Sequence, residues 1–120
     1  RVRDLEQSLA FYTELFGLKI LQMNNYTDGQ FTLAFLGFEK ESTSTLIELT
    51  HNWDEDKYEK GNAFGHLAFA VSDIYQFCHS LKAMGINITR EPGPMKFDDS
   101  EIIAFVEDPD GYSIELIEAT

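Results

Sequence analysis

Two glutamates and one histidine occupy positions in this sequence where they could do chemistry together. Glu48 and Glu115 each lie at the centre of the same apolar triplet, IEL, and His66 opens the apolar run HLAFAV. Imidazole and carboxylate groups suit a divalent ion such as nickel, cobalt, zinc or iron, and the lack of thiolate partners argues against a closed structural zinc site. Taken singly, each glutamate could instead face water on a half-buried strand, and the histidine could be an ordinary packing or surface residue.

The surroundings of the two glutamates are repeated along the chain. Each half is expected to contain a helix that begins at a capping aspartate and ends at a glycine, from Asp4 to Gly17 and from Asp73 to Gly85. Each glycine is followed by a short apolar strand, an Ala-Phe strand and the IEL triplet, and matching features recur about 70 positions further on. We therefore interpret the chain as a duplicated unit of one strand, one helix and three strands.

This repeat predicts an α+β fold of two tandem βαβββ modules within a single domain, residues 1–120. The first module covers residues 1–50, a charged and turn-rich linker covers 51–65, and the second module covers 66–120.

The opening strand of the first module is expected to be truncated. Alignment of Val71 with Val2 leaves only Arg1 and Val2 of that strand, and the counterpart of His66 would stand four positions before Arg1. A second histidine is therefore expected upstream of Arg1. Two imidazoles and two carboxylates at matched sites favour an open metal site, because a metal would also compensate carboxylates on a concave sheet face.

The end of the chain carries two further expectations. The stretch DPDG, 108–111, is expected to form a turn without a catalytic role. Glu118, three residues after Glu115, is expected on the opposite face of the strand, facing water.

The composition limits the possible functions. A chain of 120 residues that is 43% hydrophobic can form a globular core. With 21 acidic and 9 basic residues its net charge is −12, which disfavours binding to nucleic acid. No apolar run approaches the roughly 20 residues of a membrane span, and the single cysteine, Cys78, excludes an internal disulfide. We expect a cytoplasmic enzyme or binding domain without nucleic-acid or membrane partners.

Three stretches of the chain resemble the glyoxalase I family of the vicinal-oxygen-chelate superfamily, in its short bacterial form. They are RVRDLEQSLAFYTELFGLKIL, LIELTHNWDEDKYEKGNAFGHLAFAV and IAFVEDPDGYSIELIE. The resemblance implies a homodimer with metal sites between its subunits. Glu48, His66 and Glu115 match the family's metal-ligand positions, and the fourth ligand, a histidine, would lie upstream of Arg1. The short linker resembles members that prefer nickel (Ni2+) or cobalt (Co2+), and zinc (Zn2+) stays possible.

The activity implied by the resemblance is that of a lactoylglutathione lyase. Such an enzyme isomerises the hemithioacetal of methylglyoxal and glutathione to S-D-lactoylglutathione through an enediolate, which detoxifies methylglyoxal. Glu115 would be the principal base, and Glu48 a ligand that could serve the opposite face of the substrate. A carboxylate beside a divalent ion suits this reaction because the ion acidifies the carbon and the carboxylate moves the proton.

Five more residues are expected at the substrate. Arg1 and Asn52 match family positions that contact glutathione, by charge and by amide hydrogen bonds. Arg90, Met95 and Lys96 lie where the family closes a loop over the substrate, although Arg90 and Lys96 could equally be solvated loop charges.

Two other functions remain open from the sequence. One is another metal-dependent reaction of the same superfamily, such as an epimerase or an extradiol dioxygenase, because the fold hosts several chemistries. The other is a metal-free module that binds small molecules, against which the retention of Glu48, His66 and Glu115 argues.

Overall fold

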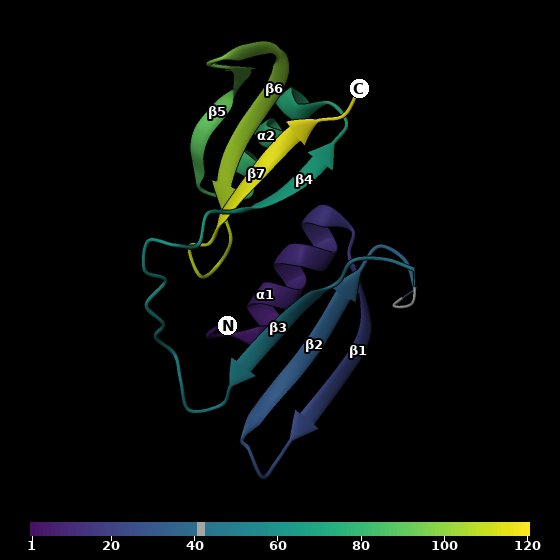
Figure 1. The fold of residues 1–120 in the computed structure, drawn as a ribbon, viewed down its shortest axis with the longest axis vertical. Helices are drawn as coiled ribbons and strands as arrows, with labels where there is room; N and C mark the ends of the chain where they lie inside the picture. Colours follow the sequence, from purple (N-terminus) through teal and green to yellow (C-terminus); the bar gives the residue numbers. More distant parts are fainter. Residues whose placement is uncertain (41–42) are drawn as a thin grey trace. The chain divides into compact units, whose positions relative to one another are not determined.

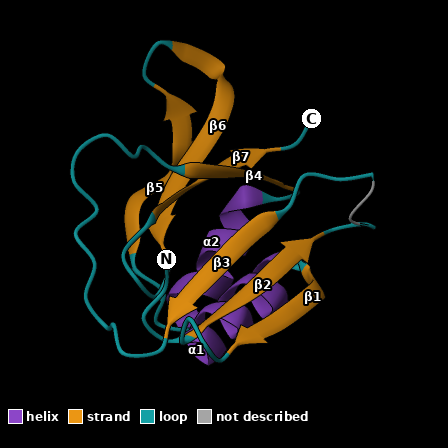
Figure 2. Ribbon diagram, turned by 60° about the horizontal axis from the view of Figure 1, so that its bottom comes forward, coloured by secondary structure: helices purple, strands orange, loops and turns teal. Residues whose placement is uncertain are grey.

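The computed structural model describes residues 1–40 and 43–120, which form two compact units. Unit 1 comprises Arg1–Lys60 and unit 2 comprises Gly61–Thr120. The division falls inside the segment expected to be the linker. Each unit consists of one β-sheet with a helix against one of its faces (Figures 1 and 2), so the α+β class is confirmed.

Unit 1 contains a three-stranded antiparallel sheet in the order β1-β2-β3. Its elements are α1 (Leu5–Ala10), the π-helical segment η1 (Phe11–Leu15), β1 (Lys19–Tyr26), β2 (Phe31–Gly37) and β3 (Ile47–Asn52). The carboxylate of Asp4 caps α1, since its Oδ1 accepts from the Gln7 N–H at 3.1 Å. The N–H of Val2 donates to the Thr50 carbonyl at 2.9 Å, so the chain before α1 lies beside β3.

The first helix is less regular than its sequence pattern predicts. After Ala10 its hydrogen bonding becomes π-helical. The aromatic rings of Phe11 and Tyr12 are both buried and lie 5.0 Å apart, and Phe16 lies 5.5 Å from Phe11. A π turn adds a residue to the helical repeat and changes which side chains face inward.

Unit 2 is a full βαβββ module. Its elements are β4 (Leu67–Val71), α2 (Ile74–Ala83), β5 (Ile88–Met95), β6 (Asp98–Glu107) and β7 (Ser113–Glu118). The strand order is β4-β7-β6-β5, with β4 parallel to β7 and the other pairs antiparallel. The helix α2 packs against β5, β6 and β7. No helix in the described part of the chain combines the length and hydrophobicity that crossing a membrane requires.

Two turns in unit 2 follow the sequence pattern. Gly85, with φ of +83°, ends α2 in the left-handed region that glycine adopts without strain. The N–H of Gly111 donates to the Asp108 carbonyl at 2.9 Å, which confirms the DPDG turn.

The internal repeat is preserved in the cores of the two sheets. The central strands bury matching positions: Ala34 and Leu36 on β2, and Ala104 and Val106 on β6. Between these buried positions, Phe35 pairs with Glu48 on β3, and Phe105 pairs with Glu115 on β7. Because side chains alternate across a strand, both glutamates lie on the sheet face that the helix does not cover, called here the open face.

Candidate metal centre

His66 and Glu115 come together on the open face of the unit 2 sheet. The Nε2 atom of His66 lies 3.2 Å from Oε1 of Glu115. Glu115 is held in β7 between two neighbouring strands, where it pairs with Ala68 on β4 and Phe105 on β6. The ring of Phe105 packs edge-on against the His66 ring, with centroids 5.2 Å apart. The side chain of His66 is 41% exposed and that of Glu115 only 17%, so the histidine is accessible and the carboxylate is mostly covered.

The spacing of this pair suits two ligands of one divalent ion. Ligand atoms about 2.1 Å from an ion lie about 3.0 Å apart at a right angle and about 3.4 Å apart at the tetrahedral angle. The separation of 3.2 Å between the His66 nitrogen and the Glu115 oxygen falls between these values. Imidazole and carboxylate are also donors that nickel, cobalt and zinc accept. The pair therefore fits a metal, but it supplies two of the three or more protein ligands found in catalytic sites.

Glu48 has the corresponding environment in unit 1. It is exposed on β3, opposite Phe35. The hydroxyl of Thr50 donates to its Oε2 at 3.5 Å, which is at the long limit of a hydrogen bond. Within the described residues, the single chain gathers no group of three or more His, Cys, Asp or Glu side chains that could hold a metal. The role of Glu48 as a ligand therefore stays a prediction.

Asn52, at the end of β3, is held in place by contacts that the sequence analysis missed. Its Nδ2 donates to the Tyr58 hydroxyl at 3.3 Å. The next residue, Trp53, donates its N–H to the Gln30 carbonyl at 2.9 Å and its indole N–H to the Thr32 hydroxyl at 2.8 Å. Contacts of this kind join a strand end to a turn and to the linker, so no local sequence pattern identifies them. They position the amide of Asn52, whose binding to glutathione stays a prediction.

The other expected substrate contacts lie at two places. Arg1, the first residue of unit 1, is exposed. Arg90, Met95 and Lys96 belong to the β5–β6 hairpin, in which PGPM forms the end of β5 rather than a loop. Lys96 places its Nζ 5.2 Å from the ring centroid of Phe97, a residue that is 86% exposed. The contacts of these four residues with glutathione also stay predictions.

The expectation that Glu118 faces water is wrong. Its Oε2 accepts from the N–H of Ile74 at 3.0 Å, at the first residue of α2. Asp73 accepts from the N–H of Gln76 at 3.1 Å, so two carboxylates satisfy the start of this helix. Glu118 does lie opposite Glu115, but that face of β7 is covered by α2. The sequence carried a signal for this outcome. Glu118 follows the apolar residues Ile114 and Leu116 at intervals of two, so it lies on the same, buried face of the strand.

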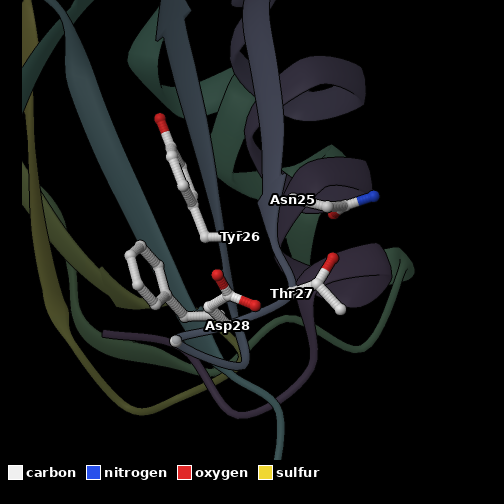
Figure 3. A pocket seen from close by; sticks show the side chains of 6 residues that line it. Asn25, Tyr26, Thr27 and Asp28 are labelled. Carbon is white, nitrogen blue, oxygen red and sulfur yellow. The ribbon is translucent and has the colours of Figure 1, made fainter.

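A shallow cavity of about 420 Å³ lies at the β1–β2 turn of unit 1 (Figure 3). Its lining residues are Asn25, Tyr26, Thr27, Asp28, Gly29 and Phe31. The rings of Tyr26 and Phe31 stack with centroids 4.9 Å apart. A Cβ atom on Gly29 would lie 2.5 Å from the Phe31 ring, so only glycine leaves room for this arrangement. Phe31 also pairs with Asn52, which places the aromatic stack beside an expected substrate contact. The sequence analysis did not identify this cavity.

Cys78 is not part of a site. Burial on the inner face of α2 raises the pKa of its thiol, and the carboxylate of Glu91 adds to this effect while Lys82 opposes it. A buried, protonated thiol is a poor nucleophile and a poor metal ligand. Cys78 therefore acts as a packing residue.

Known proteins resemble this chain in sequence and in fold. Residues 1–116 match the family described as Glyoxalase/Bleomycin resistance protein/Dioxygenase superfamily. The chain is 53% identical over 120 residues to a probable lactoylglutathione lyase of Synechocystis sp., covering 100% of this chain and 91% of the relative. It is 52% identical over 118 residues to a lactoylglutathione lyase of Neisseria meningitidis serogroup A, covering 98% of this chain and 85% of the relative.

A solved structure shows the same fold. The crystal structure of glyoxalase I from Zea mays matches the chain with a TM-score of 0.93 and 47% sequence identity. The match covers 100% of this chain and 42% of the maize chain, so this chain spans less than half the length of that protein. On the family match and these identities, the chain belongs to the glyoxalase/bleomycin resistance protein/dioxygenase superfamily.

Proposed function

We propose that this protein is a metal-dependent lactoylglutathione lyase. It converts the hemithioacetal of methylglyoxal and glutathione to S-D-lactoylglutathione and so detoxifies methylglyoxal. The observation that carries the proposal is the pair formed by His66 and Glu115, whose donor atoms lie 3.2 Å apart on an open sheet face. Relatives about half identical over nearly the whole chain are named lactoylglutathione lyase, which supports the same reaction.

The proposed site holds one divalent ion, with nickel or cobalt favoured over zinc. Its ligands are Glu48, His66, Glu115 and a histidine upstream of Arg1, contributed by two subunits of a homodimer. Two of these ligands already converge within unit 2. The remaining ligands are proposed to come from the second subunit.

Glu115 is the proposed proton carrier. A bound divalent ion would polarise the substrate oxygens and make the neighbouring C–H bond more acidic. The Glu115 carboxylate then takes the proton from one carbon and returns it to the adjacent carbon, through an enediolate of the substrate. Its fixed place in β7 limits reorganisation during the transfer. Glu48, in the matching environment of unit 1, is proposed as a ligand that can serve the opposite face of the substrate.

Positive and amide groups are proposed to bind the anionic glutathione. Arg1 and Asn52 lie in unit 1, whereas Lys96 and the apolar side chain of Met95 lie on the β5–β6 hairpin of unit 2. A protein with a net charge of −12 must attract an anion by local rather than overall charge. We place this activity in the cytoplasm, where a buried free thiol such as Cys78 stays reduced.

The test measures metal binding and turnover in the same preparations. The full-length protein is stripped with a chelator and reloaded with nickel, cobalt or zinc, and formation of the thioester product is followed. We expect His66→Ala to weaken metal binding by at least about tenfold, because outer-shell changes alone reach that size. His79→Ala, at an exposed position on α2, is the matched control and keeps metal and activity.

Three results would contradict the proposal. Wild-type protein that binds no divalent ion would point to a binding module. Metal-loaded protein without lyase activity would point to another reaction of the superfamily. Unchanged metal affinity in His66→Ala would remove His66 from the site.

A further inference from the structure

The β5–β6 hairpin contains prolines where its backbone ladder needs donors. Pro92 and Pro94 lie within β5 and carry no N–H. The pairing register between the strands shifts on both sides of Arg90 and again after Pro94. Carbonyl groups in such a segment must find donors outside the ladder, because unpaired polar groups are costly when they are partly buried.

Arg90 supplies these donors from its side chain. Its Nη1 donates to the Gly93 carbonyl at 2.9 Å and to the Ile103 carbonyl at 2.7 Å, and its Nη2 donates to the Pro94 carbonyl at 2.8 Å. A longer contact of 3.3 Å joins Nη1 to the Glu91 carbonyl. The guanidinium therefore ties together carbonyls of both strands. Its planar fork can reach several acceptors at once, which a lysine ammonium on a flexible stem cannot reproduce.

The same arginine lies between the hairpin tip and the candidate metal centre. Arg90 pairs with Phe105 across β5 and β6, and Phe105 pairs with Glu115 across β6 and β7. In the other direction, β5 continues through Met95 to Lys96 at the turn. Arg90 is therefore joined by strand pairing to Phe105 on β6 and by the continuous chain to the hairpin tip.

We infer that Arg90 is a positioning residue for substrate binding rather than a direct contact of glutathione. It donates to carbonyls of both strands where the prolines and bulges interrupt the ladder, and so holds the hairpin in one conformation before substrate arrives. A preformed hairpin presents Met95 and Lys96 without the entropy cost of ordering them during binding. The inference rests on the proposed function for the identity of the substrate.

The test compares Arg90→Lys and Arg90→Gln with wild type in the full-length, metal-loaded protein. We expect each variant to raise KM for the hemithioacetal about tenfold while kcat changes less than about twofold. Amide hydrogen exchange in residues 91–97 should become faster in both variants, whereas exchange in β4 and β7 stays as in wild type. Lys19→Gln, which removes a positive charge at an exposed position on β1 in the other unit, is the matched control. It should leave KM and exchange unchanged.

A direct charge contact with glutathione predicts a different pattern. Arg90→Lys would then keep most of the affinity, and the dependence of KM on salt would fall in Arg90→Gln. Either result, or unchanged hydrogen exchange at 91–97, overturns the inference. The exchange experiment needs no substrate, so a wild-type protein without lyase activity would refute the proposed function while the role of Arg90 in the hairpin is still measured.

Discussion

Glu115 and Glu118 lie three residues apart on β7 and have opposite environments. Glu115 lies on the open face, 3.2 Å from the imidazole of His66. Glu118 lies on the helix-covered face and accepts a hydrogen bond from the start of α2. Alternation along the strand separates the two carboxylates, so one is available to a metal and the other is a structural acceptor.

The role of Glu115 as proton carrier predicts the effect of Glu115→Gln. We expect kcat to fall by about 10²- to 10⁴-fold, because the amide cannot take up a proton as the carboxylate does. Its oxygen can still bind a metal, so substantial metal content should remain, as measured by elemental analysis of the purified protein. Glu101→Gln, at an exposed position on β6, is the matched control. Full turnover in Glu115→Gln would remove Glu115 from the reaction.

Because the thiol of Cys78 is buried, we expect the free energy of unfolding to depend on pH in the alkaline range. Its folded-state pKa is raised, chiefly by burial. The stability it contributes is therefore complete below the unfolded-state pKa of about 8.5 and is lost as pH rises through the folded-state pKa. Urea unfolding from neutral pH to about pH 10 should show a steeper loss of stability in wild type than in Cys78→Ala, since the other titrating groups are shared. Parallel profiles of the two proteins would contradict this.

At the scale of elements, each unit depends on contacts between its sheet and its helix. In unit 2, the N–H groups of Ile74 and Gln76 at the start of α2 are satisfied by Glu118 and Asp73. Because Glu118 belongs to β7, its hydrogen bond joins α2 to the strand that carries Glu115. In the β5–β6 hairpin, where prolines interrupt the ladder, the side chain of Arg90 donates hydrogen bonds to the backbone carbonyls.

The helix contact predicts the cost of removing Glu118. Glu118→Ala should lower the free energy of unfolding by about 1 to 2 kcal/mol, because an N-terminal N–H of α2 loses its acceptor and the helix dipole loses a nearby anion. Glu118→Gln should cost less, since its amide oxygen can still accept. Urea denaturation measures both, with Glu101→Ala as a control in the same sheet. Equal stability of all three variants and wild type would show that the contact contributes nothing.

At the scale of the whole molecule, the two units carry the same motif and divide the proposed ligands between them. Glu48 lies in unit 1, whereas His66 and Glu115 lie in unit 2. Both glutamates pair with a phenylalanine of the central strand, Phe35 or Phe105. A homodimer could combine unit 1 of one chain with unit 2 of the other, and closed two-fold symmetry would then create two equal sites.

If each metal site is built from two subunits, two inactive variants should recover activity when they form a mixed dimer. Glu48→Gln and Glu115→Gln should each be nearly inactive as pure proteins. Mixed dimers formed by co-expression would contain one doubly altered site and one intact site. Because half of randomly formed dimers are mixed, we expect recovery of about a quarter of wild-type activity. Two tags purified in series isolate the mixed dimer, and no recovery in that fraction would show that each site belongs to a single chain.

Much of the fold was predictable because it depends on local or repeated patterns. The capping residues Asp4 and Asp73, the terminating Gly85 and the DPDG turn act within a few residues of themselves. The repeated IEL triplets identified two equivalent strands. In the structure each glutamate of these triplets pairs with a phenylalanine on the neighbouring strand. The irregular first helix could not be predicted, because the π turn at Phe11 departs from the regular period.

By itself the sequence determined the βαβββ repeat, the family resemblance and the choice of Glu48, His66 and Glu115 as candidate ligands. Only the tertiary structure decided that His66 lies 3.2 Å from Glu115, and that Glu118 accepts a hydrogen bond from the start of α2. It also decided that Arg90 donates hydrogen bonds to carbonyls of the bulged β5–β6 hairpin. The physical reason is that these contacts join residues of different elements. They depend on strand register, on bulges and on which sheet face a helix covers, and packing of the whole unit sets all three.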